Sequence, residues 1–196
     1  IRTTIPVTNG TVIINITGVI TFIPNNDYNG TVTFPYEITD GTNTASANQT
    51  IIVTPVNDEP IAIDDNYTTD EDITINIEPM TDGTPDINVD GDLLVISSIN
   101  GENITGGIQT IIVTNGTVNI DSANVITYEP NSNYNGSDSF DYTICDPNNS
   151  CDTATITFTI NAINDDPVAI DDNYTMFENT IITLFPLVND NDLIEG

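Results

Sequence analysis

The sequence predicts an all-β protein arranged as a row of similar β-sandwiches, and composition is the first of three observations behind this prediction. Ile, Val and Thr account for 76 of the 196 residues, whereas Ala, Leu, Met, Lys, Arg, Gln and Glu together account for 25. Because β-branched side chains lose freedom in helices and pack well on pleated sheets, this composition favours strands. Ile, Val, Leu and Phe contribute 56 residues, enough apolar material for a folded core.

An internal repeat of about 107 residues is the second observation. The segment 56–68 returns as 163–175 at an offset of 107, and the segment 9–40 returns as 115–146 at an offset of 106. A unit of this length is a normal size for one β-sandwich domain. The repeat divides the chain into the C-terminal half of one unit, one complete unit and the N-terminal part of a third, at residues 1–57, 58–164 and 165–196.

Short apolar or alternating runs between turn signals are the third observation. Alternation is clearest in the last run, where every second residue from Ala154 to Ile160 is apolar and the others are Thr, as in a strand with one wet face. About seven strands in about 107 residues fit an antiparallel, immunoglobulin-like (Ig-like) sandwich. The strands expected in the complete unit are Ile73–Ile77, Leu93–Ile99, Ile108–Val113, Thr117–Ile120, Val125–Tyr128, Ser139–Ile144 and Thr153–Ile163.

Turn residues occur at matching places in the first two units. Asn-Gly at 9–10 and at 115–116 is followed by Thr-Val, which predicts a β-hairpin. Tyr28 and Tyr134 precede the penultimate strand of their units. They are either tyrosine corners or simple aromatic residues beside a turn.

The incomplete units at the two ends of the chain have two interpretations. They are either arbitrary cuts in a longer array, or they complete each other between molecules by strand addition. The second interpretation would make the chain a self-polymerising filament subunit. Under both, neighbouring repeats are the main partners of each unit, and self-association into filaments is left open.

The charge balance excludes several classes of function. The chain has 30 acidic residues, one Arg and neither Lys nor His, so its formal net charge is −29. Nucleic acids and anionic membrane surfaces bind basic residues, so we expect neither as a partner. No run of about 18 apolar residues is present, so we expect no direct membrane insertion. Without an imidazole base or an ammonium group, we also expect no enzyme.

The acidic residues concentrate near the predicted joints between units. Residues 57–92 and 165–196 carry 20 of the 30 acids in 68 positions. If folding brings these acids together, a cation or raised pKa values must relieve their repulsion. Ca²⁺ fits best, because it takes roughly six to eight oxygen ligands, whereas zinc prefers His and Cys. The alternative is a solvated acidic surface suited to salty surroundings.

One acidic stretch resembles a calcium loop without being an EF-hand. Asp86–Asp92 alternates oxygen ligands with a Gly, but Ser97 occupies the twelfth position, where an EF-hand has Glu. Such a loop can still supply ligands to a joint. The predicted metal ligands in and beside the complete unit are Asn57, Asp58, Glu59, Asp65, Glu71, Asp72, Asp90 and Asp92.

The motifs together resemble the tandem cadherin-like and Ig-like repeats of very large bacterial cell-surface adhesins, particularly those of marine and flavobacterial species. The residues that carry the resemblance are Val-Asn-Asp-x-Pro-x-Ala-x-Asp-Asp-x-Tyr at 56–67, its copy at 163–174, Asp-x-Asn-x-Asp-Gly-Asp at 86–92 and Tyr-x-Pro-Asn-x-x-Tyr-Asn-Gly at 128–136. The resemblance covers essentially the whole chain. It implies an extracellular stalk or surface filament whose joints are stiffened by Ca²⁺.

The same resemblance assigns calcium positions in both copies of the linker. Asn57, Asp58 and Asp65 occupy linker positions that are associated with calcium in cadherin-like repeats, and Glu71 lies where an acid at the end of a strand would face the joint. The equivalents in the third unit are Asn164, Asp165, Asp172 and Glu178.

Two further pairs of residues bear on compartment and chemistry. Cys145 and Cys151 bracket an expected hairpin tip, where a disulfide would indicate an oxidising, extracellular setting. Asp138 and Asp141 flank Phe140, and we expect both carboxylates on the solvated face opposite Phe140 rather than in a glycosidase site. An adhesive module that binds surface glycans is the alternative function, although the chain has no Trp.

Overall fold

The computed structural model describes residues 3–190, which divide between two compact units. Unit 1 comprises the residues up to Asp58 together with Val89–Gly91, and unit 2 comprises Glu59–Asn88 and the residues from Asp92 onward. The described residues form fourteen strands and no helix, which confirms the all-β class. In this part of the chain there is accordingly no helix able to cross a membrane.

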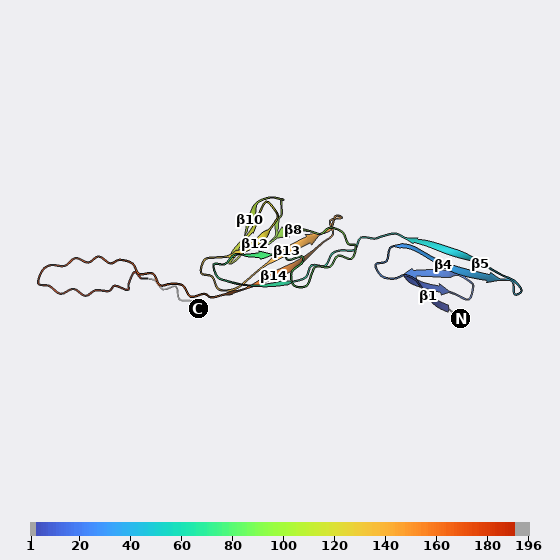
Figure 1. The fold of residues 1–196 in the computed structure, drawn as a ribbon, viewed down its shortest axis with the longest axis horizontal. Helices are drawn as coiled ribbons and strands as arrows, with labels where there is room; N and C mark the ends of the chain where they lie inside the picture. Colours follow the sequence, from blue (N-terminus) through green and yellow to red (C-terminus); the bar gives the residue numbers. More distant parts are fainter. Residues whose placement is uncertain (1–2, 191–196) are drawn as a thin grey trace. The chain divides into compact units, whose positions relative to one another are not determined.

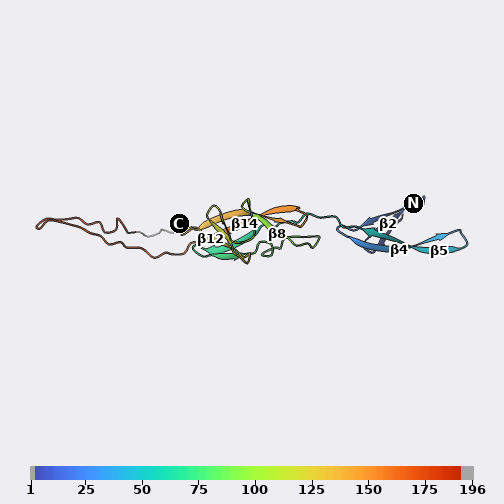
Figure 2. The same ribbon diagram turned by 90° about the horizontal axis from the view of Figure 1, so that it is seen from above.

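Unit 2 is a sandwich of two sheets (Figures 1 and 2). One sheet has four strands in the order β10 (Gln109–Ile112), β11 (Gly116–Ile120), β12 (Ile126–Pro130) and β7 (Ile75–Ile77). The other has five, in the order β6 (Asp65–Asp70), β14 (Cys151–Asn161), β13 (Gly136–Cys145), β8 (Val95–Ile99) and β9 (Glu102–Asn103). All neighbouring strands are antiparallel except β6, which pairs in parallel with β14.

Alternating side chains from both sheets fill the core of unit 2. Every second residue of β14 from Ala154 to Ile160 is buried, as the sequence pattern predicts. Phe158 stacks on Tyr128 with ring centroids 3.9 Å apart and on Tyr67 at 5.6 Å. Burying large aromatic rings removes much apolar surface from water, so this cluster is a main source of the stability of unit 2.

Unit 1 contains the counterparts of β10 to β14 only. Its sheets are β1 (Thr3–Val7), β2 (Gly10–Ile14) and β3 (Ile20–Pro24), and the hairpin of β4 (Gly30–Thr39) and β5 (Thr44–Val53). The fully buried apolar residues described in this unit are Val12, Val32 and Phe34, a much smaller set than in unit 2. Unit 1 is therefore half of a sandwich with an open core.

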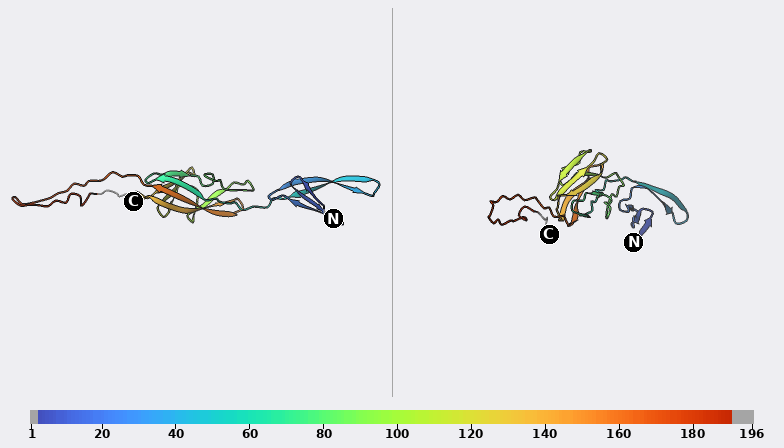
Figure 3. Two further views of the ribbon diagram at one scale, coloured as in Figure 1. Left: turned by 90° about the horizontal axis from the view of Figure 1, so that it is seen from below. Right: turned by 60° about the vertical axis from the view of Figure 1, so that its left-hand side comes forward.

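Residues 162–190, near the red end of the colour scale, form no named strand and carry no arrow in Figure 3. The segment keeps local contacts that unit 2 also has. The backbone N–H of Phe185 donates to the Tyr174 hydroxyl at 3.3 Å, as that of Glu78 donates to the Tyr67 hydroxyl at 3.1 Å. The turns of this segment thus match those around β6 and β7, although the segment itself forms no sheet.

Each strand run that the sequence predicts overlaps an observed strand, and the strands of unit 2 outside those runs are β6 and β9. The Asn-Gly hairpins are also confirmed, since β1 pairs with β2 and β10 with β11. Of the two interpretations of the tyrosines, the structure favours simple aromatic residues beside a turn. Tyr28 and Tyr134 each donate a hydrogen bond to a carbonyl only three residues onward, that of Thr31 and that of Ser137.

Candidate functional site

The predicted acids separate into three groups, and the first lies in unit 1. A hollow of about 270 Å³ is lined by Asp27, Asp58 and Asp90 together with Tyr28 and backbone around them. The backbone N–H of Asp58 donates to Asp90 Oδ2 at 2.7 Å, which fixes the 89–91 loop against the end of the linker. We call these three acids the Asp58 group. Three acidic side chains with no basic residue in the lining make the hollow attractive to cations.

The second group is buried inside unit 2, around Asp65. The first residue of β6 turns its side chain inward, and Asp65 is only 3% exposed. Asp65 Oδ2 and Asp86 Oδ2 are both buried without a hydrogen-bond partner. Tyr142 donates to Asp86 Oδ1 at 2.9 Å, and Gly83 closes the site, since a Cβ there would lie 3.2 Å from Asp65 Oδ1. We call this pair the Asp65 site.

The surroundings of Asp65 favour its neutral form. Burial first, and then the nearby charges of Asp86, Asp82 and Asp64, raise the pKa of Asp65 to about 6. A buried carboxylate without a partner is expensive, so this site needs a proton or a cation at neutral pH. The chain itself offers neither Lys nor His to provide one.

The third group lies where the chain leaves unit 2. Glu71 is buried and accepts a hydrogen bond from the backbone N–H of Ile163, just after β14. Asp72 Oδ1 accepts from the backbone N–H of Asn133 at 3.1 Å. With its amide nitrogen facing the acids, Asn133 also donates to Asp72 Oδ2 at 3.2 Å and to Asp165 Oδ2 at 2.9 Å. We call Glu71, Asp72 and Asp165 the Asp165 group.

The structure thus brings some predicted ligands together and leaves others apart. Asp58 and Asp90 meet in one group, Asp72 and Asp165 share the Asn133 amide in another, and Asp65 lies separately in the core. Glu71, next to Asp72 in the chain, instead accepts from the backbone of Ile163. No group of three or more acidic, Cys or His side chains among the described residues is arranged to hold a metal ion as it stands. The remaining predicted ligands are all exposed: Asn57, Glu59, Asp92, Asn164, Asp172 and Glu178.

Sequence reasoning missed Asp27, Asp86 and Asn133 as members of these sites. The repeat itself contains the signal for two of them, because Asp27 aligns with Asn133 at the offset of 106. Both residues have a positive φ, 58° and 54°, in the turn before the longest hairpin. An amide that donates to acids in unit 2 is therefore replaced in unit 1 by a carboxylate, which cannot donate when ionised.

The cysteines lie at the tip of the β13–β14 hairpin. Cys145 and Cys151 are directly opposite in the antiparallel register and are joined by a disulfide, with Cα atoms 4.2 Å apart. The disulfide closes a short loop, and no free cysteine is present among the described residues.

The expectation that Asp138 faces solvent is wrong. Residues 138 and 140 are two apart on β13, so both point into the core, whereas Asp141 points outward. Buried Asp138 accepts hydrogen bonds from the Tyr128 hydroxyl at 2.8 Å and from the backbone N–H of Asn115 at 3.1 Å. Its role is to anchor the β10–β11 turn to the core, and the two carboxylates are not a glycosidase pair.

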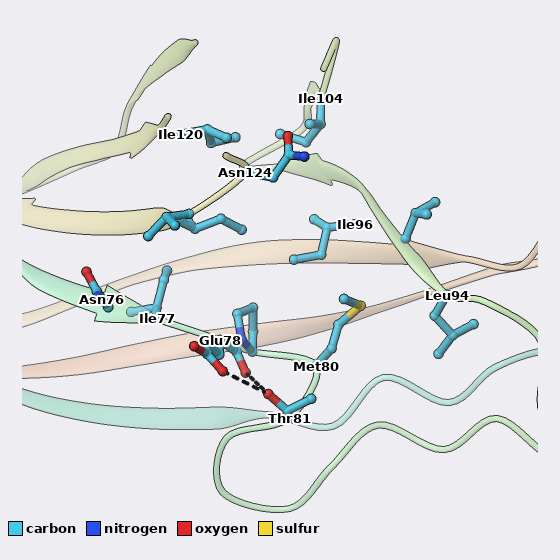
Figure 4. A pocket seen from close by; sticks show the side chains of 14 residues that line it. Asn76, Ile77, Glu78, Met80, Thr81, Leu94, Ile96, Ile104, Ile120 and Asn124 are labelled. Atoms are coloured by element: carbon cyan, nitrogen blue, oxygen red, sulfur yellow. Dashed lines mark hydrogen bonds between the residues drawn. The ribbon is translucent and has the colours of Figure 1, made fainter. Parts of the chain in front are cut away.

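Unit 2 also has an apolar groove of about 570 Å³ (Figure 4). Ile77, Met80, Leu94 and Ile104 line it, and Glu78 is the one acid among its described lining residues. The Thr81 hydroxyl, 3.4 Å from both the carbonyl oxygen and Oε2 of Glu78, is its local hydrogen-bond donor. The other lining residues carry no charge.

The sandwich of unit 2 and the matching strands of unit 1 place this protein in the class of tandem Ig-like repeats. The chain belongs to the bacterial Ig domain family, whose sequence model matches residues 57–159, and the cadherin-like domain family matches residues 2–54. Such families are typically non-enzymatic, and their domains are commonly extracellular or surface-exposed.

Comparison with curated proteins gives no match. Two solved structures are similar over most of the chain, both of them endo-fucoidan hydrolases of glycoside hydrolase family 107. The first, MfFcnA4 with the substitution H294Q, is 13% identical over 86% of this chain with a TM-score of 0.35, and MfFcnA9 is 13% identical over 81% with a TM-score of 0.31. This chain spans only about a quarter of their length, 25% and 27%.

Proposed function

We propose that this chain is a structural repeat module of an extracellular stalk or surface filament, and that Ca²⁺ bound by the acids near its joints stiffens it. The observation that carries the proposal is the gathering of acids in the Asp58 group and the Asp165 group of a chain with a single basic residue. Because the protein supplies no counter-charge, the cations must come from solution.

The Asp58 group and the Asp165 group are the proposed ion sites. Both offer carboxylate oxygens with Asn residues beside them, which is ligand chemistry that suits Ca²⁺. Both also lie where residues of one unit continue into the next. An ion that binds acids from the linker and from the adjoining loop removes their repulsion and restricts rotation of the linker.

The two groups differ in the hydrogen bonds that their carboxylates accept when no ion is bound. In the Asp165 group the Asn133 amide already donates to two carboxylates. In the Asp58 group the corresponding residue is Asp27, which adds charge instead. We therefore expect the Asp58 group to bind Ca²⁺ more tightly than the Asp165 group.

Calcium titration of the full chain tests this proposal. We expect thermal unfolding to shift upward in millimolar Ca²⁺, since a ligand at 100 times its dissociation constant adds about 2.7 kcal/mol. We also expect slower proteolysis near Asp58. The double variant Asp58→Asn with Asp90→Asn should lose most of the shift.

A matched control removes two charges elsewhere. Glu37→Gln with Glu129→Gln changes exposed strand residues outside all three groups and should keep the calcium response. If NaCl of equal ionic strength reproduces the whole shift, or if both double variants lose it equally, the acids are a solvated surface and the calcium proposal is wrong.

A further inference from the structure

The four-stranded sheet of unit 2 has β10 at one margin, with β11 on one side and no strand on the other among the described residues. The backbone N–H of Val113 donates to the Gly116 carbonyl at 3.1 Å, and in an antiparallel pair every second residue exchanges such bonds. The backbone groups of Thr110 and Ile112 therefore point away from the sheet. We call residues 108–112 the open edge.

A side chain of the β8–β9 turn confirms this direction. The Asn100 amide nitrogen donates to the Ile112 carbonyl at 3.2 Å from outside the four-stranded sheet. The carbonyl keeps a second lone pair for a partner strand. Thr110 presents its N–H and its carbonyl at the same margin. The open edge thus has the donors and acceptors that strand addition uses.

The open edge has none of the features that keep other strands away. Proteins usually protect exposed edges with charges, with Pro or by making the edge strand very short. The other marginal strands of unit 2 follow this rule, since β6 begins and ends with Asp, β7 has three residues and β9 has two. By contrast, residues 103–120 contain no charged residue, in a chain with 30 acids.

The sequence of unit 1 protects the corresponding edge. At the offset of 106, β1 corresponds to β10, and Pro6 takes the place of Ile112. Pro has no N–H, so β1 lacks a donor at the position where the open edge presents one. Arg2 likewise aligns with Ile108, so a charge in one repeat corresponds to an apolar side chain in the next.

The apolar side chains of the open edge are arranged symmetrically. Ile108 is 82% exposed and Ile112 is 67% exposed, and each lies two residues from Thr110. In an antiparallel pair of two such edges centred on Thr110, Ile108 of each copy lies opposite Ile112 of the other. The same register brings together the outward-pointing backbone groups of the two Thr110 residues. The open edge is therefore complementary to itself.

We propose that the open edge pairs antiparallel with the open edge of a second copy of this chain and joins the two four-stranded sheets into one. The occupant is a second copy because the register is symmetric and because neither chain brings a charge within β10 or β11, although each carries −29 overall. Both copies use the same surface, so the pairing closes at a dimer and does not extend further.

Sedimentation velocity of the 196-residue chain tests this inference. We expect a species at twice 21.1 kDa whose share rises with protein concentration. The solution should contain about 0.15 M NaCl, which screens repulsion between the two acidic chains. It should also contain chelator, which keeps the result separate from the calcium proposal. If the chain is monomeric at all concentrations, the inference is wrong.

Replacing Ile112 by Pro copies the residue of unit 1 into the open edge. The variant loses the outward N–H but keeps an apolar side chain, and β1 already accommodates Pro at the corresponding position. We expect the dimer to disappear while urea unfolding of the chain changes little. A dimer that persists in Ile112→Pro would place the contact elsewhere and overturn the inference.

Two Arg substitutions separate strand pairing from unspecific apolar association. Ile108→Arg places the residue of unit 1 beside the open edge and should weaken the dimer, although it makes the chain less negative. Leu93→Arg is the matched control, because Leu93 is also an exposed apolar residue of unit 2 that lies outside a strand. Its variant should dimerise normally. Equal weakening in both variants would contradict the proposed register.

Amide hydrogen exchange gives a direct readout of the backbone pairing. Exchange at Thr110 and Ile112 should slow as the protein concentration rises, because their N–H groups gain partners only in the dimer. Exchange at Ile111, whose N–H points toward β11 in both states, should respond less. If dimerisation leaves the exchange of Thr110 and Ile112 unchanged, the two edges do not pair.

Discussion

Replacing Asp65 by Asn should stabilise unit 2 at neutral pH, although it changes a buried residue of the repeated motif. In the folded chain the carboxyl is 3% exposed and its pKa is about 6, above the ordinary value of 3.8. The unfolded chain therefore ionises more readily than the folded one. Each pKa unit is worth about 1.36 kcal/mol, so ionisation at pH 7.5 destabilises the fold by about 3 kcal/mol.

The sign of the pH dependence follows from the raised pKa. The stabilising protonated form is fully present below about pH 3.8 and is lost as the pH rises through about 6. The amide side chain in Asp65→Asn carries no charge, so the variant should not show this loss. We expect the advantage of Asp65→Asn to be near 3 kcal/mol at pH 7.5 and below about 1 kcal/mol at pH 4.

Hydrogen exchange measured on β13 and β14 in chelator reports this difference for unit 2 alone. The slowest amides of these central strands open only with the whole unit, and an advantage of about 3 kcal/mol slows their exchange by about 100-fold. Comparing variant and parent at the same pH cancels the intrinsic rates. Asp92→Asn removes an exposed charge and should change exchange little. Parallel pH profiles for parent and Asp65→Asn would refute the reasoning.

Three further variants test the packing of unit 2, each by urea unfolding. Gly116→Ala should destabilise unit 2 by about 1–3 kcal/mol, because the new Cβ would lie 2.6 Å from a backbone oxygen and 2.7 Å from the Tyr128 ring. An unchanged stability would show that β12 shifts freely to make room. Tyr128→Phe removes a hydrogen bond to buried Asp138 and should lower the stability of unit 2 by about 1.5–3 kcal/mol. A change near zero would mean that water replaces the hydroxyl. Cys145→Ser with Cys151→Ser opens a short loop and should lower the free energy of unfolding by about 2 kcal/mol. Reductant should destabilise the parent by the same amount and should leave the variant unchanged.

Apolar periodicity was sufficient to predict most of the strands but not β6. The buried positions of β6 include Asp65 and Thr69, so its inward face has no apolar pattern for the sequence to reveal. The strand exists because β14 offers a parallel edge and because Tyr67 packs on Phe158. Long-range pairing thus determined an element that local preference would assign to a loop.

The candidate sites were predictable as a concentration of charge and not as geometry. The sequence places acids near both ends of unit 2, but it does not show that Asp65 points inward while Asp92 points to solvent. The inward direction of Asp138 follows from its spacing of two from Phe140, but its partner, the Tyr128 hydroxyl, comes from another strand. Side-chain partners that come from distant strands are fixed only when the sheets pack.

The parallel pairing of β6 with β14 has a mechanical consequence. Tension applied through the two ends of unit 2 pulls β6 and β14 past each other along their length, so the ladder from Asp65–Ile156 to Asp70–Asn161 is loaded all at once. A hairpin pulled at its open end breaks one pair at a time and yields at lower force. Unit 2 is therefore built to carry load along the chain, and force spectroscopy should show it unfolding in a single high-force step rather than by gradual peeling.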